Sequence, residues 1–118
     1  MDISQALLKL RPGAEWSIIG DTYEGLRWFE TNESPAPTEE EITQELENLR
    51  AAEPMRRLRI ERDRLIAETD WWVLPDRTPT SEQLAYRQAL RDLPSTAAPV
   101  LDFTTRLGIS GVTWPVKP

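Results

Sequence analysis

Four carboxylates in and just after an arginine-rich segment have the types and spacing that acid–base catalysis could use. They are Asp63, Glu68, Asp70 and Asp76. Two carboxyl groups held close together can act as general acid and general base, as in glycoside hydrolysis. Arginines surround these four, so we expect them to form ion pairs instead. We therefore assign no catalytic residue.

An acidic run at residues 39–41 could in principle bind a cation. The backbone ligands and the glycine of a calcium-binding loop are missing around it. Three consecutive glutamates also suit the positive end of a helix dipole. We interpret the run as a solvated helix N-terminus and assign no metal site.

The chain lacks the side chains on which much enzyme chemistry depends. Its 118 residues include no histidine and no cysteine. Disulfides, thiolate nucleophiles, Cys/His zinc sites and imidazole acid–base catalysis are therefore excluded. No glycine-rich phosphate cradle accompanies the arginines. We expect a protein without enzymatic activity and without a cofactor.

Charge is distributed unevenly along the chain, whose net charge is -6. Residues 1–54 carry four basic and twelve acidic side chains, and residues 55–118 carry ten basic and eight acidic ones. An acidic protein repels phosphate at a distance, so we expect no nucleic-acid partner. The arginine segment is expected to pair with the acidic segment at residues 39–53, within one chain or between copies. No apolar run is long enough for a membrane span.

The N-terminal third has the pattern of a helix followed by a hairpin. Apolar residues recur at helical spacing over residues 2–10. Two strands are expected at residues 15–19 and 25–30, with Trp16 and Trp28 as their aromatic anchors. A two-stranded hairpin is marginal alone, so it must pack on a helix or on another chain.

Three helical segments are expected after the hairpin. Thr38 with Glu41 forms a capping-box pattern at the start of the first. Pro54 is expected to break or kink that helix and to begin the second. Thr80 or Ser81 is expected to cap the third.

We predict an α+β protein with a short N-terminal helix and β-hairpin, then a mainly helical C-terminal half with an irregular tail. Residues 1–34 form the first module, residues 35–37 a linker, residues 38–94 the helical region and residues 95–118 an extended tail. Within the tail, a short strand is expected at residues 111–114.

The stretch RDRLIAETDWWVLPDRTPTSEQLAYRQALRDLP, residues 62–94, joins an arginine-rich helix to a second helix through a proline-bearing turn. It resembles the tail assembly chaperone proteins of tailed bacteriophages. The matching residues are Arg62, Arg64, Leu65, Asp70, Trp71, Pro75, Tyr86, Arg87, Leu90, Arg91, Asp92 and Pro94. The ending GVTWPVKP is similar to the close of tail fibre assembly proteins.

This resemblance implies a small binding protein that helps a tail fibre, or another tail protein, to fold, oligomerise or attach in the host cytoplasm during phage assembly. Fibre chains expose apolar surface and unpaired strand edges before assembly, and a binder can mask these without chemistry. Self-association stays open as a second mode of contact. The alternative is a minor structural subunit of the tail or baseplate, or a fibre-associated one, retained in the virion tail.

Within this motif we expect Tyr86, Arg87, Leu90 and Arg91, with Asp70 and Trp71, to hold the two C-terminal helices together. Pro75 and Asp92 complete the motif. Adjacent helical residues point about 100° apart, so one buried face cannot easily hold both Trp71 and Trp72. Trp71 holds the family position, and the resemblance places it at the helix junction.

The partner is expected to contact residues outside that junction. Trp72 points away from Trp71 and is the candidate anchor for the fibre chain, because tryptophan is enriched at binding hot spots. Arg59 and Arg62 on the arginine helix are also assigned to the partner surface. We expect Trp114 and Pro115 in the tail to be ordered chiefly by a partner.

Overall fold

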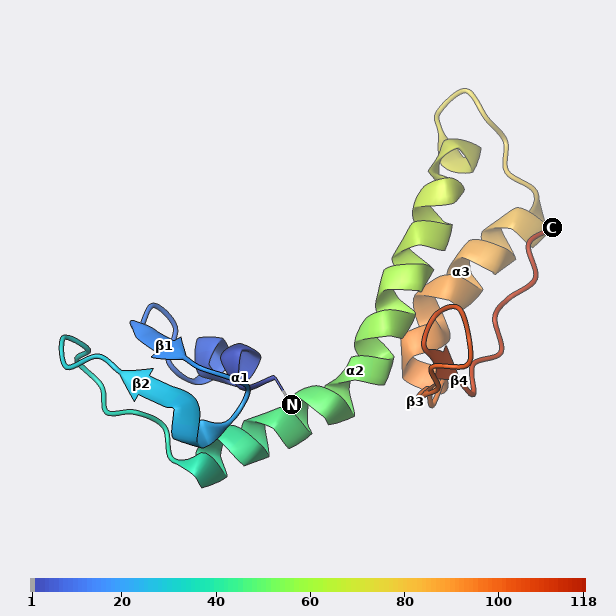
Figure 1. The fold of residues 1–118 in the computed structure, drawn as a ribbon. Coiled ribbons are helices and arrows are strands. Elements are labelled where there is room, and N and C mark those ends of the chain that lie inside the picture. The colour runs from blue at the N-terminus through green and yellow to red at the C-terminus, as the bar shows by residue number, and fades with distance from the viewer. Residues whose placement is uncertain (1) are drawn as a thin grey trace. The chain divides into compact units, whose positions relative to one another are not determined.

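The structure of the protein is a computed structural model, which describes residues 2–118. It confirms the predicted α+β class (Figure 1). The elements in chain order are α1 (Ile3–Leu10), β1 (Trp16–Ile18), η1 (Tyr23–Gly25), β2 (Leu26–Trp28), α2 (Glu39–Glu68), η2 (Asp70–Val73), α3 (Ser81–Thr96), β3 (Val100–Leu101) and β4 (Ile109–Ser110). The chain forms two compact units, Met1–Ala51 and Ala52–Pro118, whose boundary lies inside α2.

The first unit is built around one apolar face of α1. Asp2 caps this helix by accepting a hydrogen bond from the Gln5 backbone N–H at 3.3 Å. Ile3 and Leu7, one turn apart, are buried together with Ile42 of α2. The hairpin packs against this cluster. The helices thereby supply the apolar surface that a two-stranded sheet requires for stability.

The hairpin has the predicted position, and its two tryptophans face each other. β1 and β2 are antiparallel, with Trp16 opposite Trp28 and Ile18 opposite Leu26. All four side chains pack against the core of the first unit. The assigned strands are shorter than the expected ranges, because only their central residues belong to the ladder.

Gly25→Ala is expected to open this hairpin. A Cβ at position 25 would overlap the backbone carbonyl oxygen of Ile19. The backbone of one of the two strands would have to move to relieve this clash. Overpacking of this kind costs about 2 kcal/mol. Hydrogen exchange at the amides of Ile19 and Phe29, which donate across the ladder, should accelerate about thirtyfold. Ser17→Ala on the exposed face is the control, and unchanged exchange in Gly25→Ala would contradict the packing.

Helix α2 begins as predicted and then runs through Pro54. Thr38 Oγ1 accepts from the Glu41 N–H at 3.1 Å, as a capping residue should. The break expected at Pro54 is wrong, since the helix is continuous from Glu39 to Glu68. Glu53 accepts hydrogen bonds from Arg56 at 2.7 and 2.8 Å and from Arg57 at 2.8 Å. These bonds clamp the turn in which proline removes one backbone donor.

The clamp makes the stability of this turn depend on pH. Hydrogen bonds from Arg56, and next from Arg57, lower the pKa of Glu53 from 4.5 to about 2. A lowered folded-state pKa contributes stability above the unfolded pKa, and this contribution is lost as the pH falls towards 2. Glu53→Gln should therefore cost about 1 kcal/mol at pH 7 and nothing at the acid end. The measurement is thermal unfolding of both proteins, followed by circular dichroism, at pH 7 and at about pH 2. Glu47→Gln, without an ion pair in the described structure, is the matched control.

The second unit packs α3 beside residues 52–68 of α2 (Figure 1). Thr80 is the N-cap of α3, and it forms a reciprocal capping box with Gln83, so one of the two predicted caps is confirmed. One core cluster holds Leu58, Leu93 and Ile109, and a second holds Trp72, Tyr86 and Leu90.

The tail is more ordered than the sequence indicates. The strand expected at residues 111–114 is wrong. β4 lies at Ile109–Ser110 instead and pairs with β3, an element that the sequence reading misses. Trp114 packs against the Leu58 cluster of its own chain, and Pro115 is half-buried. Trp114 therefore has a packing surface within its own chain, and the expectation that a partner orders Trp114 and Pro115 stays a prediction.

Candidate functional site

The site is the junction where α2 ends and the chain turns towards α3. Trp72 lies in η2 and is only 4% exposed. Its ring lies 5.9 Å from that of Tyr86, centroid to centroid, and Leu90 closes the same cluster. Tyr86 and Leu90 are one turn apart on α3, so one face of this helix covers the ring.

Arg87 ties the end of α2 to α3. Its Nη1 donates to the Ile66 carbonyl oxygen at 3.1 Å and to Thr69 Oγ1 at 2.7 Å, and its Nη2 donates to Asp70 Oδ1 at 3.1 Å. The Arg87 side chain is 6% exposed, and its Nε has no partner in the described part of the chain. The Ile66 carbonyl also accepts from the N–H and the hydroxyl of Thr69, each at 3.0 Å, so Arg87 adds a third donor from outside α2 at the helix end.

The two adjacent tryptophans have the opposite burial from that expected. Trp71 is 48% exposed, whereas Trp72 is buried, so the assignment of Trp71 to the interior and Trp72 to the surface is wrong. The chain changes at Thr69 from an α-helix to a tighter 3₁₀ turn. This change alters the rotation per residue and turns the second ring inward.

Trp71 is exposed but held in place. Its ring meets Trp72 edge-on, with centroids 6.2 Å apart and an interplanar angle of 78°. The guanidinium carbon of Arg77 lies 4.6 Å from the Trp71 centroid, a cation–π geometry. Val73, Leu74 and Pro75 are also exposed in this turn. We call Trp71, Val73, Leu74 and Pro75 the apolar tip.

The C-terminal tail reaches the same junction from another side. Lys117 Nζ donates to Glu68 Oε1 at 2.8 Å and lies 5.8 Å from the centroid of the Trp72 ring. The bond from Lys117, and then the nearby Arg64, lowers the pKa of the Glu68 carboxyl. The last turn of α2 is therefore linked to the tail by an exposed ion pair.

The structure brings together only part of the predicted set. Tyr86, Arg87 and Leu90 meet the end of α2, as does Asp70 through Arg87. Arg91 and Asp92 do not join them. Both are exposed and make side-chain hydrogen bonds to Gln88 of the same helix.

The arginine segment pairs mostly with its own neighbours. Arg62 binds Asp63, and Arg64 binds Glu61 and Glu68. Of the acidic segment expected to pair with these arginines, only Glu53 does so within the described chain. Arg59 is exposed and has no ion pair among residues 2–118. Most of these pairs have i,i+3 or i,i+4 spacing, and Arg62 with Asp63 are adjacent, so short-range spacing decides this pairing.

Three contributors to the junction were missed by the sequence reading. Thr69 accepts from Arg87, Arg77 covers Trp71, and Lys117 reaches Glu68. Thr69 follows Leu65 at helical i,i+4 spacing on the apolar face of the arginine helix, and this spacing is the signal that could have identified it. The contact of Lys117 spans 49 residues and leaves no local trace in the sequence.

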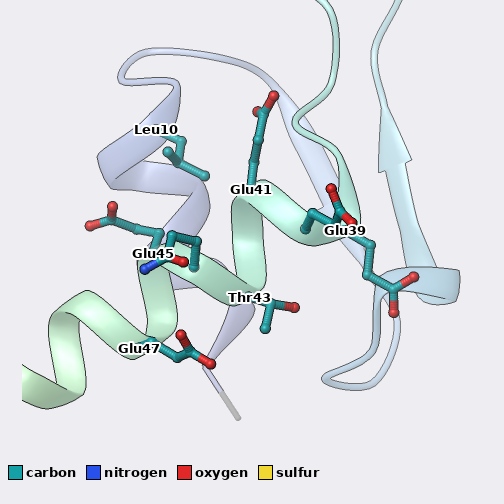
Figure 2. A pocket seen from close by; sticks show the side chains of 8 residues that line it. Leu10, Glu39, Glu41, Thr43, Glu45 and Glu47 are labelled. Atoms are coloured by element: carbon teal, nitrogen blue, oxygen red, sulfur yellow. The ribbon is translucent and has the colours of Figure 1, made fainter.

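A shallow hollow in the first unit, between Leu10 and the start of α2, is lined by acidic side chains. Glu41, Glu45 and Glu47 point in different directions there, as Figure 2 shows. No group of three or more acidic, histidine or cysteine side chains within residues 2–118 is placed to hold a metal ion. The hollow is a solvated face of α2.

Comparison with known proteins addresses the second unit. Residues 55–118 match the family model described as phage tail assembly chaperone protein. No significant match to the chain was found among curated proteins or among solved structures. Within residues 2–118, none of the helices combines the length and the apolar composition that a membrane span requires. The matched segment is more than half of the chain and contains the whole junction between α2 and α3, and on this evidence the chain belongs to the phage tail assembly chaperone protein family.

Proposed function

We propose that the protein binds a tail fibre protein in the host cytoplasm and helps it to fold, oligomerise or attach, by covering its apolar surface without covalent chemistry. Family membership supports a role as a phage tail assembly chaperone. The fibre is chosen among tail proteins because the ending GVTWPVKP is similar to that of tail fibre assembly proteins.

The presentation of Trp71 carries the proposal. A half-exposed tryptophan offers a large apolar body with a polar N–H, which is the composition of an interface anchor. Contacts with Trp72 and Arg77 fix the ring before binding. A side chain that is already ordered loses little conformational entropy when a partner covers it.

The rest of the apolar tip extends this anchor into a surface. Val73 and Leu74 are both nearly half exposed and directly follow the buried Trp72. Such a surface can cover exposed apolar side chains of an unassembled fibre chain, which would otherwise aggregate. Covering and release need no catalytic group, in agreement with a chain that has neither histidine nor cysteine.

Co-expression with the tail fibre protein of the same phage tests the proposal. We expect the two to co-purify and the soluble yield of the fibre protein to rise, whereas an unrelated soluble protein of similar size gives neither effect. A fibre protein that stays equally insoluble and does not co-purify would overturn the proposal. The alternative, a structural subunit retained in the virion, is tested by quantifying the chain in purified virions. An amount equimolar with the fibre protein would indicate a structural subunit.

A further inference from the structure

We infer that the free edge of β1 is a second binding surface, which accepts an extended, basic segment of a partner protein as a third strand. This surface lies in the first unit, outside the segment matched by the family model. It is therefore separate from the apolar tip and goes beyond the proposed function of that tip.

The register of the hairpin shows which backbone groups point outward. Ile19 N–H donates to the Gly25 carbonyl, and Phe29 N–H donates to that of Glu15. Hydrogen-bonded and non-hydrogen-bonded pairs alternate along an antiparallel ladder. The pairs Trp16–Trp28 and Ile18–Leu26 are consequently non-hydrogen-bonded ones. On β1, the N–H and C=O groups of Trp16 and Ile18 face away from β2.

These outward groups have no partner within the described chain. No hydrogen bond of residues 2–118 uses the backbone N–H or C=O of Trp16 or Ile18 outside the hairpin. An unpaired strand edge is a template for another strand, and proteins commonly protect such edges with bulges, prolines or covering loops. β1 contains no proline, since its sequence is Trp-Ser-Ile, and no bulge, since each of its residues pairs with one residue of β2.

The opposite edge, on β2, is flanked by the protein itself. The Trp28 indole N–H donates to the Ser34 carbonyl at 3.0 Å, and the Tyr23 hydroxyl donates to the Pro37 carbonyl at 3.2 Å. These two contacts draw residues 34–37 past both ends of β2, as the course of the chain in Figure 1 shows. The asymmetry selects β1 as the edge that is left for a partner.

An exposed apolar side chain lies at the end of the same strand. Ile19 follows β1 directly and is 72% exposed. Alternation along the strand places it on the outer face with Ser17, opposite the buried face of Ile18. A third strand on this edge would place a side chain beside Ile19 and cover it.

Charge selects the kind of strand that binds. Residues 1–51, which form the first unit, include eleven acidic and four basic side chains. In the described structure the only ion pair of the acidic residues 39–47 joins Glu41 to Arg11. A second copy of this unit would bring the same excess of negative charge, which disfavours pairing of β1 with itself. A basic segment gains attraction instead.

The test uses the full-length, isotope-labelled protein and three short synthetic peptides. One alternates valine with lysine, one alternates valine with glutamate, and one is the lysine peptide interrupted by proline. We expect only the uninterrupted lysine peptide to slow amide exchange of Trp16 and Ile18, by about tenfold or more at saturation. Added salt should weaken its binding.

A pair of variants links the effect to the edge. Ile18→Pro removes an N–H that faces away from the ladder, a position where an edge strand tolerates proline. It should abolish protection of Trp16 by the peptide, whereas Ile18→Val, which keeps the N–H, should retain it. The exchange experiment on the unmodified protein decides the matter if the proline variant misfolds.

Unchanged exchange of Trp16 and Ile18 with the lysine peptide would overturn the inference, and so would any of three other results. Protection of Leu26 and Trp28 instead would place the peptide on β2. Protection of Trp16 and Ile18 that grows with protein concentration, without peptide, would assign the edge to a second copy. Equal protection by the lysine and glutamate peptides would remove the charge argument.

Discussion

Arg87→Ala should destabilise the second unit by about 3 kcal/mol, because it removes a buried side chain together with its hydrogen bonds. Thr69 would lose the donor to its fully buried hydroxyl oxygen, and the Ile66 carbonyl would lose a donor that caps the end of α2. The space left between α2 and α3 cannot close easily, since Leu90 and Tyr86 are already packed beside it.

A matched control is one turn further along the same helix. Arg91 is exposed and donates only to Gln88, at 3.5 Å, so Arg91→Ala should stay within about 0.5 kcal/mol of the unmodified protein. Denaturant unfolding followed by tryptophan fluorescence, to which Trp71, Trp72 and Trp114 of the second unit contribute together with the two tryptophans of the first, measures both. Equal unfolding midpoints for the two variants would show that the Arg87 bonds do not stabilise the junction.

Local chemistry explains which parts of the fold the sequence predicts. Thr38 and Thr80 mark the starts of α2 and α3. A capping threonine accepts a hydrogen bond from the backbone N–H three residues later, so a stretch of four residues is enough to predict it. The Trp16–Trp28 hairpin follows from short-range alternation. The prediction at Pro54 fails because the bonds from Arg56 and Arg57 to Glu53 counteract the tendency of proline to break a helix. This compensation depends on side-chain rotamers, which the sequence does not show.

Long-range packing explains what the sequence misses. β3 and β4 are two residues each, too short for any alternation, and they form because Leu101 and Ile109 join the Leu58 cluster. Gly108 turns this hairpin with φ +75°, and its missing side chain leaves space for Arg57, a residue far away in sequence. Only the assembled unit brings these partners together.

The candidate site also contains one part that the sequence predicts and one part that it does not. Spacing on α3 correctly groups Tyr86, Arg87 and Leu90, since they face one neighbour. Which of two adjacent tryptophans turns inward depends on the change from an α-helix to a 3₁₀ turn at Thr69. A motif records that a tryptophan is present there, but not the direction in which its ring points.

The two rings should therefore give opposite results when each is removed. Trp72→Ala empties the space between Tyr86 and Leu90 and should cost about 3 to 4 kcal/mol of folding free energy. Trp71→Ala removes a ring that is half in solvent, so the cost in stability should be below about 1 kcal/mol.

Binding should show the reverse order, provided that each variant is compared at a temperature where it is folded. An interface tryptophan contributes about 2 kcal/mol or more, so Trp71→Ala should weaken capture of the fibre protein about thirtyfold. Arg77→Ala is the intermediate case, because it frees the Trp71 ring without removing it and should weaken capture by less. Thermal melting and a titrated pull-down of the fibre protein measure the two quantities on the same preparations. If Trp71→Ala binds normally while folded Trp72→Ala does not, the partner reaches the junction by opening it, and the apolar tip is not the binding surface.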